Sequence, residues 1–206
     1  MSQENLLHYI NFIHSGVNDA VGNMNATLVS SGNHTATIVS DIGVRLKHPT
    51  DTNLQGTAQS GFIKFTNLLL PEGNKTINFW VRSQDTFEDN SYYLSLSSEV
   101  DPDENTIREN NLVNGLIIKN MNINTLYHDL QLNLYSSGRV NNEYDNRTIE
   151  TNDQCIQIRT WHMITLVFEE GVLNLYVDGV SRGKSASYLF NDLQLYQTMI
   201  LGQYVP

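Results

Sequence analysis

The apolar residues of this chain fall into short runs, some alternating with polar residues and some apolar throughout. Clusters of Asn, Gly, Ser and Asp separate the runs. No long window carries apolar residues at helical spacing without interruption by β-branched residues, Asn or Gly, so the pattern predicts few helices. Short runs bounded by turn residues are typical of β-strands. We predict strands at residues 6–12, 26–29, 61–65, 76–82, 92–97, 115–119, 129–135, 162–168, 172–177 and 198–202.

The most informative stretch is WHMITLVFEEGVLNLYVDGVSRG at residues 161–183. Residues 161–168 are apolar on both faces, which predicts a strand buried inside a two-sheet sandwich. Glu169, Glu170 and Gly171 break the run, and residues 172–177 resume it. Asp-Gly at 178–179 tolerates the positive φ angles of a type I′ turn. We therefore predict two strands joined by a tight turn, with a second turn after them.

Two other segments show the period of two that a half-buried strand produces. In residues 76–82, one face carries Ile77, Phe79 and Val81, and the other carries Asn78, Trp80 and Arg82. In residues 129–135, Leu130, Leu132 and Leu134 alternate with Gln131, Asn133 and Tyr135. The second segment is predicted to be a half-exposed antiparallel strand.

Many short strands with few helices indicate an all-β fold, a two-sheet antiparallel β-sandwich of jelly-roll type. A chain of 206 residues buries about 70% of its unfolded surface without help from a disulfide or a metal. Internal repeats and linkers are absent from the sequence, and residues 98–112 are polar enough to form a surface loop. We predict that residues 1–206 form a single domain.

The net charge of −10 and the scattered basic residues exclude a nucleic-acid partner, because phosphates require clustered Lys and Arg. No stretch approaches the about 18 apolar residues that a membrane span requires. Cys155 is the only cysteine, so it forms no internal disulfide. The N-terminus MSQENLLHYINF lacks the features of a secretory signal. We expect a protein that stays in its cell or leaves it by lysis or by assembly into a particle.

Several segments together carry a family resemblance. They are LLHYINF at 6–12, NDAVGNMNATLVSSG at 18–32, SGFIKFTN at 60–67, KTINFWVRS at 75–83, TWHMITLVFEEGVLNLYVDGVSRG at 160–183 and MILGQ at 199–203. The sequence resembles the laminin-G-like branch of the concanavalin-A-like lectin/glucanase superfamily. This resemblance implies a lectin-like, pentraxin-like jelly roll, and it says little about the ligand.

Relatives in this superfamily continue past the Ile-Leu-Gly strand into a final strand, whereas this sequence stops at Pro206. We expect either a fragment of a longer protein or a sandwich that a neighbouring chain completes. A sheet without its last strand leaves unpaired backbone groups at an edge, which invites another strand to pair there.

The resemblance also implies a calcium site at the rim of the sandwich, since such relatives hold Ca²⁺ through Asp and Asn oxygens. Asp19 and Asn23 fall in the matching segment. The alternative is that both residues close a turn around Gly22. A second oxygen-rich loop at residues 101–105 lacks the glycine spacing of an EF-hand and is interpreted as solvated.

Nothing in the sequence predicts catalysis. Retaining glucanases of this superfamily carry carboxylates at a Glu-x-Asp-x-x-Glu spacing, about 5 Å apart, and no segment matches. Glu99, Asp101, Asp103 and Glu104 lie in the predicted loop, and Glu169 and Glu170 lie in a tight turn. The histidines lack metal-ligand spacing, with His162 expected to pack in its strand, and Cys155 lacks a partner signature. We predict that the protein is not an enzyme.

Sugar rings stack on exposed aromatic faces, so the tyrosines are candidate ligand contacts. Those in or beside segments that could face a sheet surface or rim are Tyr92, Tyr93, Tyr127, Tyr135, Tyr144 and Tyr188. Tyrosine is equally an ordinary strand residue.

Three functional hypotheses follow. The first is a non-catalytic structural or adhesion protein at a virion surface, such as a capsid decoration, head fibre or tail component, with a lectin-like fold. Its partners are other particle proteins, copies of itself or host glycans, and its location is the virion or an extracellular surface. The second is a free or secreted carbohydrate-binding module. The third and weakest is a glycoside hydrolase.

Overall fold

A computed structural model of the chain describes residues 10, 16, 18–19, 21–22, 24–30, 35–47, 61–68, 70, 73–83, 92–97, 115–121, 124, 126–135, 147–185 and 198–202. These residues form strands and turns, as the all-β prediction requires, and the strand pairs are antiparallel. Of the predicted strand at 6–12, only Ile10 is among them, and the predicted loop at 98–112 lies outside them. Within this part of the chain, no helix has the length and apolar character needed to cross a membrane.

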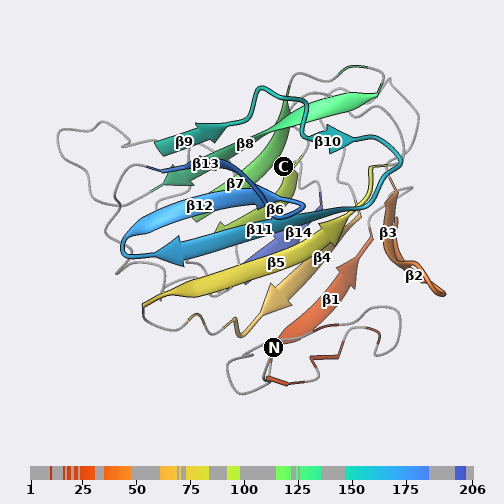
Figure 1. The fold of residues 1–206 in the computed structure, drawn as a ribbon. Coiled ribbons are helices and arrows are strands. Elements are labelled where there is room, and N and C mark those ends of the chain that lie inside the picture. The colour runs from red at the N-terminus through yellow and green to blue at the C-terminus, as the bar shows by residue number, and fades with distance from the viewer. Residues whose placement is uncertain are drawn as a thin grey trace. The chain divides into compact units, whose positions relative to one another are not determined.

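The chain divides into two compact units, each assembled from separate segments. The first unit comprises Met1–Leu69, Leu94–Leu112 and Leu195–Pro206. Its strands are β1 (Asn25–Val29), β2 (Thr35–Val39), β3 (Gly43–Lys47), β4 (Phe62–Thr66), residues 94–97 of β6 (Tyr92–Ser97) and β14 (Thr198–Leu201). β4 lies between β1 and β14, and β14 pairs with β6 on its other side (Figure 1).

The β2–β3 hairpin of the first unit was not predicted from the sequence. Its turn is closed by the Ile42 N–H, which donates to the Val39 carbonyl at 3.1 Å. Asp41 and Gly43 adopt positive φ angles of 59° and 120°. Ile42 stands between Asp41 and Gly43, so the turn lacks the Asn-Gly or Asp-Gly dipeptide that identifies hairpins in a sequence.

The second unit comprises Leu70–Tyr93 and Val113–Gln194. Its strands are β5 (Lys75–Val81), β7 (Gly115–Met121), β8 (Tyr127–Tyr135), β9 (Arg147–Glu150), β10 (Ile156–Gln157), β11 (His162–Glu169), β12 (Val172–Val177) and β13 (Val180–Lys184). β13, β12, β11 and β5 form a four-stranded sheet in that order (Figure 1). β8 pairs with β7 along one edge and with β9 and β10 along the other.

β11 is buried on one face only, so the prediction of a strand buried on both faces is wrong. Its inward residues Ile164, Leu166 and Phe168 are essentially inaccessible to solvent. The residues between them are half-buried, and Trp161, just before the strand, is 42% exposed. This second face is the more exposed one, because Met163 on it pairs with Trp80 of β5, which is 63% exposed.

β8 departs from prediction in the opposite direction. Leu130, Leu132 and Leu134 are fully buried as expected, but Asn133 on the other face is buried as well. Its amide is satisfied locally, because Thr148 Oγ1 donates to Asn133 Oδ1 at 2.9 Å and Asn133 Nδ2 donates to Gln131 Oε1 at 3.2 Å. Polar side chains on a strand therefore need not lie in water when neighbouring strands supply their hydrogen bonds.

A β-bulge in β13 brings the two sheets of the second unit close together. Tyr176 pairs with Ser181 and Leu175 with Gly183, so Arg182 is the extra residue. A Cβ atom on Gly183 would lie only 2.5 Å from Ile149 Cγ2 of β9. The bulge therefore turns Gly183 inward at a place where only a hydrogen atom fits.

The Asp178–Gly179 turn has φ angles of 53° and 78°, which confirms the predicted positive-φ turn. The Asp178 carboxylate also fastens the turn to β11. Its Oδ1 accepts the Met163 N–H at 2.8 Å, and its Oδ2 lies 2.7 Å from His162 Nδ1. The turn at Glu170–Gly171 has the same signs, with φ angles of 50° and 77°. Two-residue turns thus bound β12 at both ends.

Replacing Asp178 tests this fastening. Asp178→Ala removes both hydrogen bonds that the carboxylate accepts, and it leaves alanine in the left-handed region, where its Cβ is strained. We therefore expect the free energy of unfolding to fall by about 2 kcal/mol. Asp178→Asn keeps one acceptor oxygen and tolerates the left-handed conformation, so its loss should be about half as large. Urea denaturation measures both free energies of unfolding. Equal losses for the two variants would contradict this role of the side chain.

Gly183→Ala tests the close approach of β13 to β9. Because the added methyl group would overlap Ile149, we expect a loss of about 1–3 kcal/mol. In the double variant Gly183→Ala/Ile149→Ala the overlap disappears, so the combined loss should be smaller than the sum of the single losses. Ser181→Ala on the exposed side of β13 is the control. Strict additivity in thermal unfolding would show that the two positions do not compete for space.

Candidate functional site

Asp19 closes a turn, which is the alternative to calcium binding that the sequence left open. Its Oδ1 accepts the Val21 and Gly22 N–H groups at 3.1 and 3.0 Å, and its Oδ2 accepts the Met24 N–H at 3.1 Å. Both carboxylate oxygens therefore serve the backbone around Gly22. Asn23, the other predicted ligand, lies outside the described residues. The calcium site stays a prediction from the resemblance.

Several other candidates from the sequence also lie outside the described residues. They are Glu99, Asp101, Asp103, Glu104, Tyr144 and Tyr188. Glu169 ends β11 and Glu170 lies in the turn after it, where both are exposed. Tyr127 is half-buried at the start of β8. Among the described residues, neither glutamate belongs to a group of three His, Cys, Asp or Glu side chains that could hold a metal ion.

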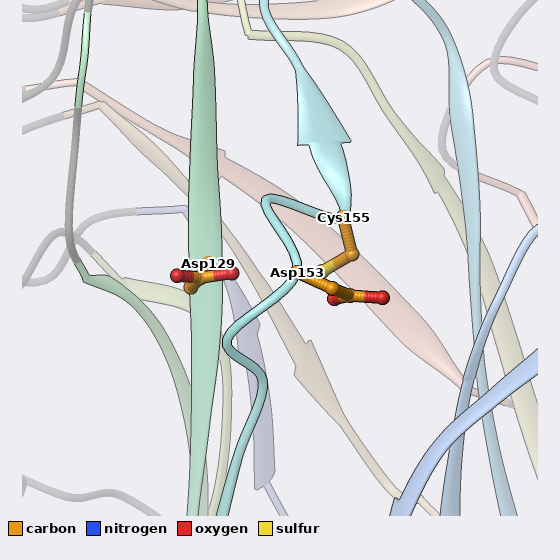
Figure 2. Close-up of side chains that lie close together, drawn as sticks. All are labelled: Asp129, Asp153 and Cys155. Atoms are coloured by element: carbon orange, nitrogen blue, oxygen red, sulfur yellow. The ribbon is translucent and has the colours of Figure 1, made fainter.

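The structure brings together three groups that the sequence did not connect: Asp129 of β8, and Asp153 and Cys155 of the segment before β10 (Figure 2). One carboxylate oxygen of each Asp and the Cys155 sulfur all lie within 4.8 Å of one another. Asp129 and Cys155 are buried, whereas Asp153 is exposed. Asp129 precedes Asp153 by 24 residues and Cys155 by 26 in the sequence, so no local motif indicates the cluster.

The Thr151 hydroxyl organises this cluster. It donates its single proton to Asp129 Oδ1 at 3.2 Å, and it accepts the Leu130 N–H at 2.8 Å. The Cys155 sulfur lies 3.3 Å from Thr151 Oγ1. Because the hydroxyl proton is already given to the carboxylate, Cys155 is the donor in this contact and carries its proton. The Gln154 N–H donates to Asp129 Oδ1 at 2.7 Å, which completes the network.

Burial raises the pKa of the Cys155 thiol, and the negative charges of Asp153 and Asp129 raise it further against the charge of Arg182. Asp153 forms an ion pair with Arg182 Nη1. A metal would require a deprotonated sulfur and a freed carboxylate. The cluster is therefore built as a hydrogen-bonded structural network, in which the bulged Arg182 ties β13 to the segment before β10.

A second buried group consists of Tyr93, His128 and Ser83. Tyr93 Oη lies 2.5 Å from His128 Nε2 and 2.8 Å from Ser83 Oγ, and the two rings are stacked. Burial raises the pKa of Tyr93. Burial, together with the nearby His162, lowers the pKa of His128 to about 4, against the opposing pull of Asp129. His128 is therefore neutral over the physiological range, and Tyr93 is a protonated phenol.

His162 packs in β11, as predicted. Its Nε2 lies 3.0 Å from the Gln157 amide nitrogen and 3.2 Å from the Gln157 carbonyl oxygen, and its Nδ1 lies 2.7 Å from Asp178 Oδ2. The predicted turn role of Asp178 is confirmed. Burial alone would raise the pKa of Asp178, but the hydrogen bonds from Met163 and His162 and the charge of Arg182 lower it below the ordinary value.

The surface feature that sequence reasoning missed is a pair of exposed tryptophans. Trp80 is 63% exposed and Trp161 is 42% exposed. Trp80 pairs with Met163 across β5 and β11, and extending this register by two residues places Trp161 opposite Arg82. Residues directly opposite share a face of the sheet, so these four side chains form one surface, which we term the tryptophan platform. The signal was present in the sequence, since Trp80 shared its predicted face with Asn78 and Arg82.

The low pKa of His128 predicts a stability change with pH. The unfolded chain takes up a proton near pH 6.5, whereas the folded chain resists until about pH 4. The stability is complete above pH 6.5 and falls on acidification, by about 3 kcal/mol at pH 4. In His128→Gln, which still reaches Tyr93 Oη, this part of the pH dependence should vanish. Urea denaturation between pH 7 and pH 4 measures the free energy of unfolding of both proteins. An equal loss of this free energy in the wild type and in His128→Gln would contradict the assignment.

Comparisons with known proteins support the fold. Domain 4 of AbnA, an extracellular arabinanase from Geobacillus stearothermophilus, aligns over 94% of this chain and 81% of its own, with 14% identity and a TM-score of 0.51. A structure from work on endo-acting O-glycanases of the human gut microbiota aligns over 87% of this chain and 78% of its own, with 12% identity and a TM-score of 0.54. Bacillus licheniformis β-glucanase gives the same coverages, with 13% identity and a TM-score of 0.51.

These identities establish the fold and no more. No curated protein matches the sequence. The sequence profile of Laminin_G_3, described as the concanavalin A-like lectin/glucanases superfamily, matches residues 56–204. The match covers most of the chain, including the strands of the four-stranded sheet. The chain therefore belongs to the concanavalin A-like lectin/glucanase superfamily and has its antiparallel β-sandwich fold.

Proposed function

We propose that this protein is a non-catalytic carbohydrate-binding domain, and that the tryptophan platform is its sugar-binding surface. The observation that carries the proposal is Trp80, which keeps 63% of its surface in solvent on a regular strand. Large aromatic side chains gain free energy when they leave water, so a rigid exposed indole is a ready contact for a ligand. The apolar faces of sugar rings match such a surface.

Polar groups beside the platform suit the hydroxyls of a sugar. In the next row of the sheet, Thr165 Oγ1 donates to Asn78 Oδ1 at 3.0 Å, and both side chains face outward with Trp80. Tyr176, paired with Thr165, continues the row and is half-buried. A few polar groups next to an aromatic contact provide orientation and specificity in a ligand site. These polar side chains belong to strand residues, so the backbone hydrogen bonds of the sheet fix their positions.

The carboxylates favour binding without hydrolysis. A retaining glycosidase needs two carboxyl groups about 5 Å apart that both reach the sugar. Asp129 and Asp153 are close enough, but Asp129 is 3% exposed and accepts bonds from Thr151 and Gln154. Asp153 is held by Arg182. Among the described residues, the carboxylate pair Asp129 and Asp153 is thus engaged in the structural network.

Proteins of similar fold include both saccharide-binding domains and saccharide-cleaving enzymes. Domain 4 of the arabinanase AbnA was solved in complex with arabinotriose. Other neighbours are a β-glucanase and an endo-acting O-glycanase. The shared fold therefore supports a saccharide as ligand, while the choice of binding over hydrolysis rests on the carboxylates of this chain.

The virion-surface role stays a prediction from the sequence, and it concerns where the domain acts. A particle-surface adhesin with host glycans as partners is compatible with the same platform. Mass spectrometry of purified particles separates this setting from a free lectin, because a particle protein has a fixed copy number.

Substitution of the two tryptophans tests the platform. On an array of neutral and acidic glycans, we expect the wild-type protein to bind at least one class. Trp80→Ala should weaken that binding by about tenfold or more, which corresponds to about 1.4 kcal/mol. Trp161→Ala should weaken it less, because this indole is less exposed.

Ile38→Ala is the matched control, since Ile38 is a large apolar residue, 45% exposed, on β2 of the other unit. It should bind like the wild type. Wild-type binding by Trp80→Ala would contradict the assignment of the platform, and release of new reducing ends from the bound glycan would contradict the non-catalytic role.

A further inference from the structure

We infer that the sugar-binding surface continues from the tryptophan platform along β11 to Tyr176, and that it takes a linear chain of about three or more sugar units. This inference rests on the proposed function and specifies the class of ligand. The ligand is an internal stretch of a linear glycan rather than one sugar at a chain end. The feature that indicates it is the spacing of Trp161, Trp80 and Tyr176 on one face of the four-stranded sheet.

Tyr176 lies on the same face of the sheet as Trp80. On β12, Leu175 and Val177 are fully buried, so Tyr176 between them points to the opposite face. Tyr176 pairs with Thr165 of β11, and Thr165 is on the face that carries Trp80. Tyr176 is half-buried, so part of its surface meets solvent. It is therefore available to a ligand that also covers the platform.

The three aromatic side chains are spread over several residues of the sheet. Trp161 precedes Thr165 by four residues, and Tyr176 is directly opposite Thr165. A strand rises about 3.4 Å per residue and lies about 4.8 Å from its neighbour, so the Cα atoms of Trp161 and Tyr176 are about 14 Å apart. Those of Trp80 and Tyr176 are about 12 Å apart by the same reasoning.

This span exceeds one sugar ring. A sugar ring is smaller than an indole, so a single ring cannot contact Trp161 and Tyr176 together. A chain that contacts both has one ring near each end and at least one ring between them, which gives about three units. The spacing of the aromatic groups thus selects for the length of the ligand.

The middle of this surface offers hydrogen bonds to the central sugar. Thr165 Oγ1 donates its proton to Asn78 Oδ1 at 3.0 Å, and this contact is exposed. The hydroxyl oxygen of Thr165 can still accept a proton, and the amide nitrogen of Asn78 carries two N–H donors. Adjacent hydroxyls of one sugar ring match such a pair of acceptor and donor. The central ring is therefore oriented by polar groups, while the outer rings stack on aromatic ones.

The arrangement follows the direction of a strand. Recognition of a single terminal sugar uses a concave pocket that encloses it. Here the aromatic groups lie along β11 and on its two neighbours, β5 and β12, which run side by side in the sheet (Figure 1). Contacts in a line suit the repeating rings of a linear chain, because each added ring meets a further side chain.

Size series of linear oligosaccharides test the inference. The probes are arabino-, xylo-, cello-, laminari-, manno- and chito-oligosaccharides, each from one to six units. Isothermal titration calorimetry with the full chain measures the dissociation constant for each member. The parent polysaccharide of any series that binds is titrated as well, and the glycan array of the platform test is run in parallel.

We expect the dissociation constant in at least one series to fall by about tenfold or more between two and four units and to change little beyond. Several protein molecules should bind to each chain of the parent polysaccharide. Tyr176→Ala should weaken binding of the four-unit chain by about fivefold and leave the two-unit chain unchanged, whereas Trp80→Ala should weaken both. Tyr176→Phe keeps the ring and should retain the preference for length.

Thr165→Val is a second, independent variant. It keeps the shape of the side chain and removes the hydroxyl, so it should weaken binding of the four-unit chain by about fivefold. Tyr127→Ala is the matched control, since Tyr127 is also a half-buried tyrosine but lies on β8, outside the four-stranded sheet. It should bind all chain lengths like the wild type. Unchanged thermal unfolding of each variant shows that the results report on binding.

Four results would overturn the inference. Full affinity for a single sugar, or one protein molecule per polysaccharide chain, would indicate recognition of a chain end while the proposed function stands. Array binding confined to glycans outside the linear series would have the same meaning. A length preference that survives in both Tyr176→Ala and Thr165→Val would place the added rings elsewhere. Failure to bind any oligosaccharide or array glycan would remove the proposed function as well.

Discussion

The pairing of β11 with β5 on one side and β12 on the other determines which way each side chain of the four-stranded sheet points. Side chains alternate between faces, so a slip of one residue would exchange the buried set with the exposed set. Burial of Ile164, Leu166 and Phe168 makes such a slip costly. The positive-φ turns on both sides of β12 fix the same register from the ends. The platform is therefore held outward by the core beneath it, since the register that buries Ile164 exposes Trp80.

Inside the second unit, the buried titratable side chains are held by hydrogen bonds to neighbouring groups. A buried carboxylate such as Asp129 costs free energy unless its oxygens are bonded. The Thr151 hydroxyl and the Gln154 N–H supply those bonds, and Cys155 then has to act as a donor. The Thr151 hydroxyl proton is used by Asp129, and Cys155 stays a thiol because burial raises its pKa. These side chains therefore act as structural ties within the second unit.

Local periodicity carried much of the fold but not its layers. The bounds predicted for β6 and β12 agree with the structure, and the two faces of β5 were assigned correctly because polar and apolar residues alternate there. Trp161 was misplaced because an apolar run looks alike whether a second layer or only neighbouring strands cover it. The bulge at Arg182 and the grouping of Asp129 with Cys155 arise from pairings between distant segments. No pattern within either segment indicates them, so the structure was needed to find them.

The acidity of the whole chain restricts which ligands approach it. At physiological ionic strength a charge is screened beyond about 8 Å, so the net charge of −10 weakens the approach of an anion more than its contact. Net charge therefore predicts poor binding of extended polyanions such as nucleic acid, which need cations along their whole length. It does not oppose a short uncharged saccharide on the tryptophan platform.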